Sequence, residues 1–344
     1  MVAGHSNEAV GQWGSGAMGQ WGSGAMRQFR TGLPHCPIAS LPHFVLVLGL
    51  FVSLPIWSAS AAHVGASRTQ VVLLGTGTPN DDPNRWGPAV AVIVDDQVYL
   101  VDAGVGVVRR AAAARAAGVT ALKVTSLSRV FLTHLHSDHT LGLPDLMFSP
   151  WVLERPVPLD VYGPNGTADM AAHLEAAWQD DIAVRLFGLE PQHTRNYRAI
   201  VHEITPGRVY QDDKVTVDAI AVTHGSWPDA FAYRFQTPDK RIVISGDTIP
   251  SAAIAAACNG CDLLIHEVYS AERFKTRPPE WQTYHKAFHT STVELAGVAE
   301  KAHPSLLVLY HQLFWGATDA DLVKEIQAAG YKGRVVSGKD LDVY

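Results

Sequence analysis

Residues 133–139 read THLHSDH and directly follow the apolar run 129–132, RVFL. Within six residues this stretch supplies three imidazoles and one carboxylate at the end of a predicted strand: His134, His136, Asp138 and His139. Side chains at a strand end can turn toward one point, and neutral imidazole together with carboxylate suits Zn²⁺. A solvated His-rich loop is the alternative for this stretch taken alone. The stretch predicts a metal site at a strand end.

Four further apolar runs lead into polar side chains that can bind a metal ion. These side chains are His224 after the run 215–222, Asp247 after 241–245, His266 and Glu267 after 263–265, and His311 after 306–310. Any one of them alone would be read as structural. Five such strand ends in one α/β chain favour a functional site, because the active sites of these folds collect at strand ends.

The rest of the pattern predicts an α/β fold. Short β-branched or apolar runs bounded by Gly, Asp or Pro predict strands at 71–74, 89–94, 98–101, 130–132, 159–162, 215–222, 230–235, 241–245, 263–266 and 306–309. Ala-rich or 3.6-residue patterns predict helices at 105–117, 168–178, 251–257, 293–302 and 319–328. Antiparallel pairs come early and strand–helix alternation comes late, which is typical of a layered α/β sandwich. No long linker divides residues 70–344, so we expect a single domain.

The composition excludes two broad classes of protein. Of the 344 residues 47% are hydrophobic, so the chain can bury a sizeable core and is not disordered over most of its length. With 27 basic and 33 acidic residues the formal net charge is −6, which gives no general attraction for nucleic acid or anionic membranes. The chain has 16 His and only three Cys, which is a high number of His, and imidazole is the commonest metal ligand.

The first 61 residues are predicted to lie outside the folded domain, which then covers residues 62–344. The octapeptide GQWGSGAM occurs twice in tandem, at 11–18 and 19–26, and such low-complexity sequence cannot form a core. Basic residues after Met26, the apolar run 44–57 and small residues up to 62 then follow the order of a signal peptide cleaved near Ala61. We expect a periplasmic or secreted protein without a stable membrane anchor, because 14 apolar residues fall short of the roughly 20 that span a bilayer. The sequence leaves open whether translation starts at Met1 or at Met26.

Cysteine usage is in keeping with export. Cys36 falls in the segment that would be removed, and Cys258 and Cys261 remain as an isolated CNGC pair. A structural zinc site would need a second pair, so a disulfide formed in an oxidising compartment is favoured. Two unpaired buried thiols are the alternative.

Motifs spread over almost the whole of residues 70–344 are similar to those of one family. They are LGTGTP (74–79), VDAG (101–104), HLHSDHTLGLP (134–144), THGSWPDAFAYR (223–234), SGDT (245–248), HE (266–267), HTST (289–292) and LYHQ (309–312). This set resembles the metallo-β-lactamase superfamily and, within it, the ribonuclease Z branch, which also contains cyclic-nucleotide phosphodiesterases and a group of arylsulfatases. The resemblance implies a four-layer αββα sandwich.

The resemblance also implies a site for two divalent ions, most simply Zn²⁺. One ion would be held by three imidazoles, the second by a carboxylate and two imidazoles, and one carboxylate would bridge both: His134, His136 and His224; Asp138, His139 and His311; and Asp247. Such a pair can hold a hydroxide at neutral pH and clamp a tetrahedral oxyanion.

The same resemblance implies three catalytic residues. Asp138 would orient or deprotonate the nucleophile, and His289, held by Glu267, would donate a proton to the leaving group. His266 is as well explained by a structural role. Asp102 in the VDAG motif is expected to orient a metal-binding loop through hydrogen bonds.

Two segments next to these motifs carry weaker signals. LGTGTP lacks the third Gly and the following helix of a nucleotide-binding loop, so a turn beside the metal site is predicted. Trp281, Tyr284 and His285 belong to a Pro-containing segment that we expect to be irregular, and their rings could wall the pocket or pack on the surface.

The sequence therefore favours an exported zinc-dependent hydrolase of a small ester, either a phosphodiester or a sulfate ester. Ribonuclease Z-type tRNA 3′ processing is less favoured, because residues 160–214 carry nine acidic and five basic side chains and no basic Gly-rich loop. Nucleic acid is accordingly not expected as a partner. A lactonase or β-lactamase-like hydrolase and a non-catalytic metal-binding protein are further alternatives, and the resemblance makes a homodimer an expectation.

Overall fold

The computed structural model describes residues 69–190 and 194–344. The octapeptide repeat, the apolar run 44–57 and the predicted cleavage near Ala61 lie outside these residues. In the part of the chain that is described, no helix is long and apolar enough to cross a membrane.

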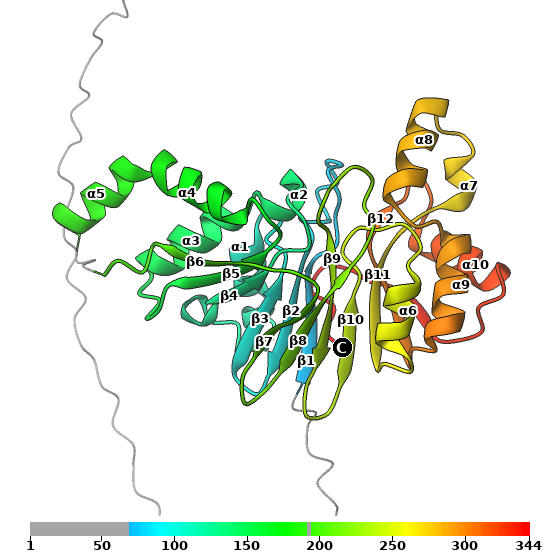
Figure 1. Cartoon of the computed structure of the whole chain (residues 1–344), viewed down its shortest axis with the longest axis horizontal. Coiled ribbons are helices and arrows are strands. Elements are labelled where there is room, and N and C mark those ends of the chain that lie inside the picture. Colours follow the sequence, from blue (N-terminus) through cyan, green and yellow to red (C-terminus); the bar gives the residue numbers. More distant parts are fainter. Residues whose placement is uncertain (1–68, 191–193) are drawn as a thin grey trace, which may run out of the picture. The chain divides into compact units, whose positions relative to one another are not determined.

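Two β-sheets form the centre of the fold (Figure 1). The first has the order β1-β2-β3-β4-β5-β6 and is made of Thr69–Gly75, Ala89–Val94, Gln97–Val101, Arg129–Phe131, Leu159–Gly163 and Ala199–Glu203. The second has the order β13-β12-β11-β10-β9-β8-β7, and β7 to β13 are Gly207–Gln211, Thr216–Ala221, Phe231–Gln236, Arg241–Ile244, Leu263–Tyr269, Leu306–Leu313 and Val335–Ser337. In each sheet antiparallel strands are followed along the chain by parallel ones.

Helices cover the outer faces of both sheets (Figure 1). The helices before the second sheet are α1 Val107–Ala116, α2 Ser137–Thr140, α3 Leu143–Val152, α4 Thr167–Ala177 and α5 Gln179–Phe187, with a 3-10 turn at Val124–Ser126. Those of the second half are α6 Ala252–Cys258, α7 Ala271–Phe274, α8 Pro279–Phe288, α9 Thr292–Ala302 and α10 Asp319–Ala328.

Three apolar cores separate the four layers. Along β1 the side chains alternate, so that Val72 and Leu74 join the core under α1 and α3, while Val71 and Leu73 join the core between the sheets. A third core packs the second sheet against α6, α9 and α10. The predicted αββα sandwich is therefore confirmed.

Several elements differ from the sequence prediction. The segment with Trp281, Tyr284 and His285 was expected to be irregular and forms α8, because Pro279 occupies the first helical position, where a missing N–H costs no hydrogen bond. Helices α2, α3, α5 and α7 and strands β6, β7 and β13 were not predicted.

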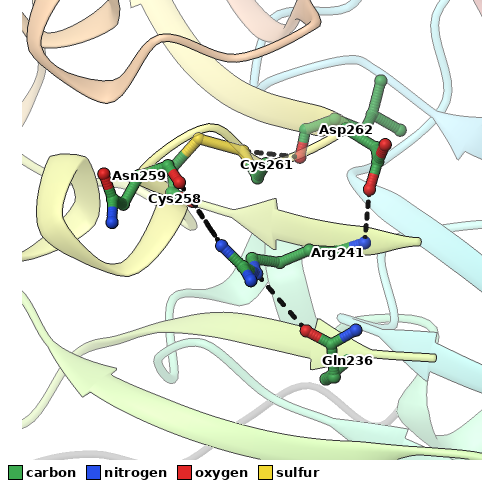
Figure 2. The surroundings of a disulfide bond; sticks show 7 residues. Gln236, Arg241, Cys258, Asn259, Cys261 and Asp262 are labelled. Carbon is green, nitrogen blue, oxygen red and sulfur yellow. Dashed lines mark hydrogen bonds between the residues drawn. A yellow bond between two sulfur atoms is a disulfide. The ribbon is translucent and has the colours of Figure 1, made fainter. Parts of the chain in front are cut away.

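Cys258 and Cys261 form a disulfide, as favoured from the sequence (Figure 2). Cys258 ends α6 and Cys261 precedes β11, and both side chains are fully buried. The guanidinium of Arg241 donates to the backbone oxygens of Cys258 and Asn259 (3.4 and 3.3 Å), and its backbone N–H donates to Asp262 (2.7 Å). These bonds tie the disulfide turn to the start of β10.

Candidate metal centre and active site

The structure brings together all seven side chains that the sequence singles out as metal ligands. β4 leads into His134 and His136 and then into α2, whose first turn carries Asp138 and His139. The remaining three come from loops after β8 and β10 and from β12: His224, Asp247 and His311. Their donor atoms form overlapping groups of three in which all atoms lie within 4.8 Å of one another.

Three imidazole nitrogens make up the first group. His136 Nδ1 lies 3.0 Å from His134 Nε2 and 3.1 Å from His224 Nε2. Burial lowers the pKa of His134 well below its ordinary value and lowers the pKa of His224 to about 4. Neutral rings whose ring nitrogens face one another at this distance are suited to a shared cation.

The second group combines Asp138, His139 and His311. Asp138 Oδ2 lies 3.2 Å from His311 Nε2 and 3.5 Å from His139 Nε2. Burial raises the pKa of Asp138, but His139 and His311 outweigh burial and lower it to about 2. For His311 the balance is reversed, because burial lowers its pKa while Asp247 and Asp138 hold the pKa above its ordinary value. A carboxylate beside two imidazoles is a donor set for a divalent ion.

Asp247 lies between the two groups. Its Oδ2 is 3.4 Å from His139 Nε2, 3.5 Å from His311 Nε2 and 4.0 Å from His224 Nε2. The residue is 2% exposed, and its Oδ1 and His139 Nε2 are buried without a hydrogen-bond partner. Buried polar atoms without partners are uncommon in folded proteins, and bound ions would satisfy them here. The residues present therefore fit two divalent ions, with Asp247 placed to touch both.

Hydrogen bonds behind the cluster fix the orientation of the imidazoles. Asp102 Oδ2 accepts from His139 Nδ1 (2.8 Å), which turns His139 Nε2 toward the cluster. The same carboxylate accepts from the backbone N–H and the hydroxyl of Thr133 (2.8 and 3.0 Å). His224 Nδ1 donates to the backbone oxygen of Phe288 (2.8 Å). The orienting role expected for Asp102 therefore has a geometric basis.

Backbone distortion also helps to aim the ligands. His311 has φ +45° and lies at an irregularity in the pairing of β11 with β12, where Glu267 pairs with Tyr310 and Val268 with Gln312. His311 is thus the extra residue of a β-bulge, a feature that re-aims side chains next to active sites. Asp102, with φ +61°, is a second left-handed residue at the site. Non-Gly residues in this region are uncommon and cluster at functional positions.

His289 and Glu267, the predicted proton donor and its partner, lie beside the metal ligands. His289 Nδ1 is 3.4 Å from Glu267 Oε2 and 3.9 Å from Asp247 Oδ2. Glu267 Oε1 accepts from the backbone N–H groups of Thr290 (2.9 Å) and Thr248 (3.3 Å), which fixes the carboxyl group. Burial, followed by Asp247, raises the pKa of Glu267 well above its ordinary value, and burial lowers the pKa of His289 to about 4. Glu267 Oε2 and His289 Nδ1 are both buried without a hydrogen-bond partner, so the two groups lie side by side at the edge of the ligand cluster.

His266 lies apart from this arrangement. Its Nδ1 contacts the backbone oxygen of Glu267 (2.7 Å), and it belongs to none of the potential metal-binding groups found among the described residues. The structural interpretation of His266 is the one that fits.

A cavity of about 380 Å³ opens onto the cluster. It is lined by His136, Asp138, Asp247, His289 and His311 from the cluster and by Pro79, Asn80, Arg277, Trp281, Tyr284, His285, Leu313 and Trp315. The LGTGTP turn and the aromatic side chains of α8 thus lie beside the site, in keeping with the pocket-wall alternative.

Trp227, Arg277 and Trp315 are among the residues of the site that were not singled out from the sequence. Trp227 Nε1 lies 2.7 Å from His136 Nε2, and Arg277 and Trp315 line the cavity. Trp227 follows His224 by three residues in the THGSWPDAFAYR motif, which was a usable signal. Arg277 and Trp315 carried no signal of this kind.

Comparisons with known proteins agree with the geometry. A family model described as "Beta-lactamase superfamily domain" matches residues 97–312. A ribonuclease Z from Mycobacterium sp. (strain KMS) is 36% identical over 246 residues, which are 71% of this chain and 84% of that protein. A ribonuclease Z from Mycobacterium bovis (strain BCG / Pasteur 1173P2) is 33% identical over 79% of this chain and 96% of its own length.

Solved structures share the fold at lower sequence identity. The metallo-β-lactamase fold protein YhfI from Bacillus subtilis superposes with a TM-score of 0.62 at 19% identity, over 80% of this chain and 98% of that chain. The short form of human tRNase Z gives a TM-score of 0.59 at 21% identity, again over 80% and 98%. The chain therefore belongs to the metallo-β-lactamase superfamily and is a metal-dependent hydrolase of ester bonds.

Proposed function

We propose that the protein is an exported zinc-dependent phosphodiesterase that hydrolyses a small phosphodiester. The observation that carries the proposal is that members of both ligand groups, together with His289, lie on the wall of a single cavity of about 380 Å³: His136 of the first group and Asp138 and His311 of the second. A cavity of this size suits a small molecule, and its walls combine apolar and aromatic surface with a few polar groups.

The chemistry would be divided between the metal ions and the side chains around them. Two divalent ions held by the seven ligands would supply positive charge beside the scissile ester and a nucleophile that is available near neutral pH. Asp138, whose pKa is lowered to about 2, stays ionised and can accept a proton from the nucleophile. His289 lines the cavity and can pass a proton to the leaving oxygen, with Glu267 Oε2 3.4 Å from its Nδ1 and placed to orient the ring.

The choice of phosphodiester over sulfate ester rests on the relatives. The curated relatives at 33–36% identity are named ribonuclease Z, and the substrate of such an enzyme is a phosphodiester. The sequence analysis did not expect nucleic acid as a partner, and these relatives make that expectation doubtful. Processing of tRNA at its 3′ end is therefore the second candidate function. Against it stand the net charge of −6 and the nine acidic against five basic residues of 160–214.

Export is supported by two independent features. The N-terminal sequence has the order of a signal peptide, and Cys258 is bonded to Cys261. Disulfides persist in oxidising compartments and are rare in the reducing cytosol.

A direct comparison of substrates tests the proposal. The zinc-loaded full chain is assayed with bis(p-nitrophenyl) phosphate, p-nitrophenyl sulfate and a tRNA precursor with a 3′ extension. We expect turnover of the small diester and not of the precursor. Efficient cleavage of the precursor at the 3′ end would replace the proposal with ribonuclease Z activity, and turnover of the sulfate alone would replace it with a sulfatase.

A further inference from the structure

The cavity wall beyond the metal ligands carries a cation, Arg277. This residue lies between α7 and α8, and its backbone is held from both sides. Its N–H donates to the backbone oxygen of Phe274 (3.0 Å), and Gln282 Nε2 donates to its backbone oxygen (2.8 Å). Pro278 and Pro279 follow directly and restrict the chain further. The side chain is therefore presented from a rigid base.

Within residues 69–190 and 194–344 the guanidinium of Arg277 has an aromatic contact and no acidic partner. Its central carbon lies 5.2 Å from the centroid of the Trp315 ring. Its Nε is buried without a hydrogen-bond partner, and among the described residues no carboxylate oxygen lies within 4.0 Å of its nitrogens. A buried donor without an acceptor is costly, so this group is suited to receive an anionic group from a ligand.

Aromatic rings connect Arg277 with the proton donor. The Trp315 centroid is 4.6 Å from that of His285, and the His285 centroid is 5.6 Å from that of His289. Trp281 stacks on His285 at 5.6 Å with an interplanar angle of 25°. Trp315 has φ +47°, a left-handed conformation that strains a bulky residue, and such strain clusters at ligand-binding positions.

We propose that Arg277 binds a second negatively charged group of the substrate, and that Trp281, His285 and Trp315 hold an aromatic ring between this group and the scissile ester. The inference rests on the proposed phosphodiesterase function and narrows it. The substrate class is a phosphodiester of an aryl or nucleoside alcohol that carries an additional anionic group. That group is a carboxylate on the ring or a phosphate on a neighbouring nucleoside.

Matched substrate pairs test this assignment. Phenyl p-nitrophenyl phosphate is compared with its 4-carboxyphenyl analogue, and the dinucleotide dTpdT is compared with its 5′-phosphorylated form pdTpdT. The readout is the ratio of kcat/KM for the charged member to that for the uncharged member of each pair. It is measured with the zinc-loaded full chain and with its Arg277→Gln, Arg277→Lys and Arg273→Gln variants. Arg273 is an exposed arginine of α7 outside the cavity lining and serves as the matched control.

Arg277→Gln is expected to lower the ratio about 10-fold, mainly through KM, since a charge-assisted hydrogen bond is lost. Arg277→Lys should restore part of the ratio, because it keeps the charge and loses the planar fork. If Arg277→Gln lowers the ratio only in the phenyl pair, the anion that Arg277 binds is a carboxylate. If it lowers the ratio only in the dinucleotide pair, the anion is a phosphate. An unchanged ratio in both pairs, or an equal drop with Arg273→Gln, would overturn the assignment.

A binding measurement separates this inference from the proposed function. If the wild type hydrolyses neither pair, the phosphodiesterase proposal fails, and calorimetric binding of pdTpdT and dTpdT then decides on Arg277. A preference for pdTpdT that Arg277→Gln abolishes supports the anion site. Equal binding of the two dinucleotides to the wild type overturns it.

Discussion

Replacement of Asp102 by Asn tests whether a residue without direct access to the metal ions controls their binding. Asp102 is 1% exposed and accepts three hydrogen bonds, two from Thr133 and one from His139 Nδ1. Asn has nearly the same shape and tolerates the φ of +61° at this position. The substitution therefore removes the negative charge of the side chain and turns one of its two acceptor atoms into a donor, while the backbone can keep its conformation.

The size of the effect follows from the tautomer of His139. With a divalent ion bound, Nδ1 would carry the proton that Asp102 Oδ2 accepts, and Nε2 would offer its lone pair to the ion. With the amide N–H₂ of Asn facing Nδ1, the ring proton would move to Nε2, where it blocks coordination. Loss of an orienting partner of this kind typically weakens metal binding about 10–100-fold, which corresponds to about 1.4–2.7 kcal/mol.

Competition with a chromophoric chelator measures the zinc dissociation constants, and thermal unfolding confirms that the variant is folded. Asp145→Asn is the matched control, because Asp145 forms an ion pair with the exposed Arg109 (2.9 Å) and belongs neither to the ligand groups nor to the cavity lining. We expect Asp102→Asn to weaken the site that contains His139 and Asp145→Asn to leave both sites unchanged. Wild-type affinity at both sites in a folded Asp102→Asn variant would refute the tautomer argument.

Three further predictions concern the same site. Glu267→Gln removes the carboxyl group 3.4 Å from His289 Nδ1 that supports this ring as a proton donor, so kcat should fall about 100-fold at unchanged zinc content, and an unchanged kcat would exclude the pair from catalysis. Burial lowers the pKa of His139, but Asp247 and Asp102 outweigh burial and hold it well above its ordinary value, so this ring keeps its proton at neutral pH. Zinc binding to chelator-treated protein should then release protons and tighten with rising pH, and calorimetric heats independent of the buffer's ionisation enthalpy would contradict this. Trp227 Nε1 donates to His136 Nε2 (2.7 Å), and a zinc ion held by Nδ1 would place the ring proton on Nε2 and so break this hydrogen bond. Zinc should therefore change the tryptophan emission of the wild type. An equal change in Trp227→Phe would argue against this contact as the cause.

The parts of the fold that the sequence predicted are those with continuous patterns. Ala89–Val94 and Asp319–Ala328 were predicted with the bounds that the structure has, because the first is apolar throughout and the second has a 3.6-residue pattern. The three missed strands, β6, β7 and β13, are all sheet edges. Their side chains are partly exposed, so no apolar run marks them.

The residues of the site also fall into those that the sequence predicted and those that it did not. Residues such as His134 and Asp247 could be predicted to converge, because they directly follow buried strands and the ends of strands are fixed by the sheets. Arg277 and Trp315 reach the cavity only through the packing of α8 and the loop after β12, which leaves no local pattern in the sequence. Helix α8 was misread because proline was taken as a sign of irregular chain, although at the first position of a helix it favours the helix.

The central claim is that seven converging side chains hold two divalent ions that the chain uses to hydrolyse a phosphodiester. Titration of the chelator-treated protein with Zn²⁺, with hydrolysis of bis(p-nitrophenyl) phosphate followed at each step, tests this claim most directly. We predict that activity rises to its maximum at two equivalents of zinc and that Asp247→Ala, which removes the shared carboxylate, abolishes this rise. Full activity without added metal, or a folded Asp247→Ala variant with the titration curve of the wild type, would contradict the claim.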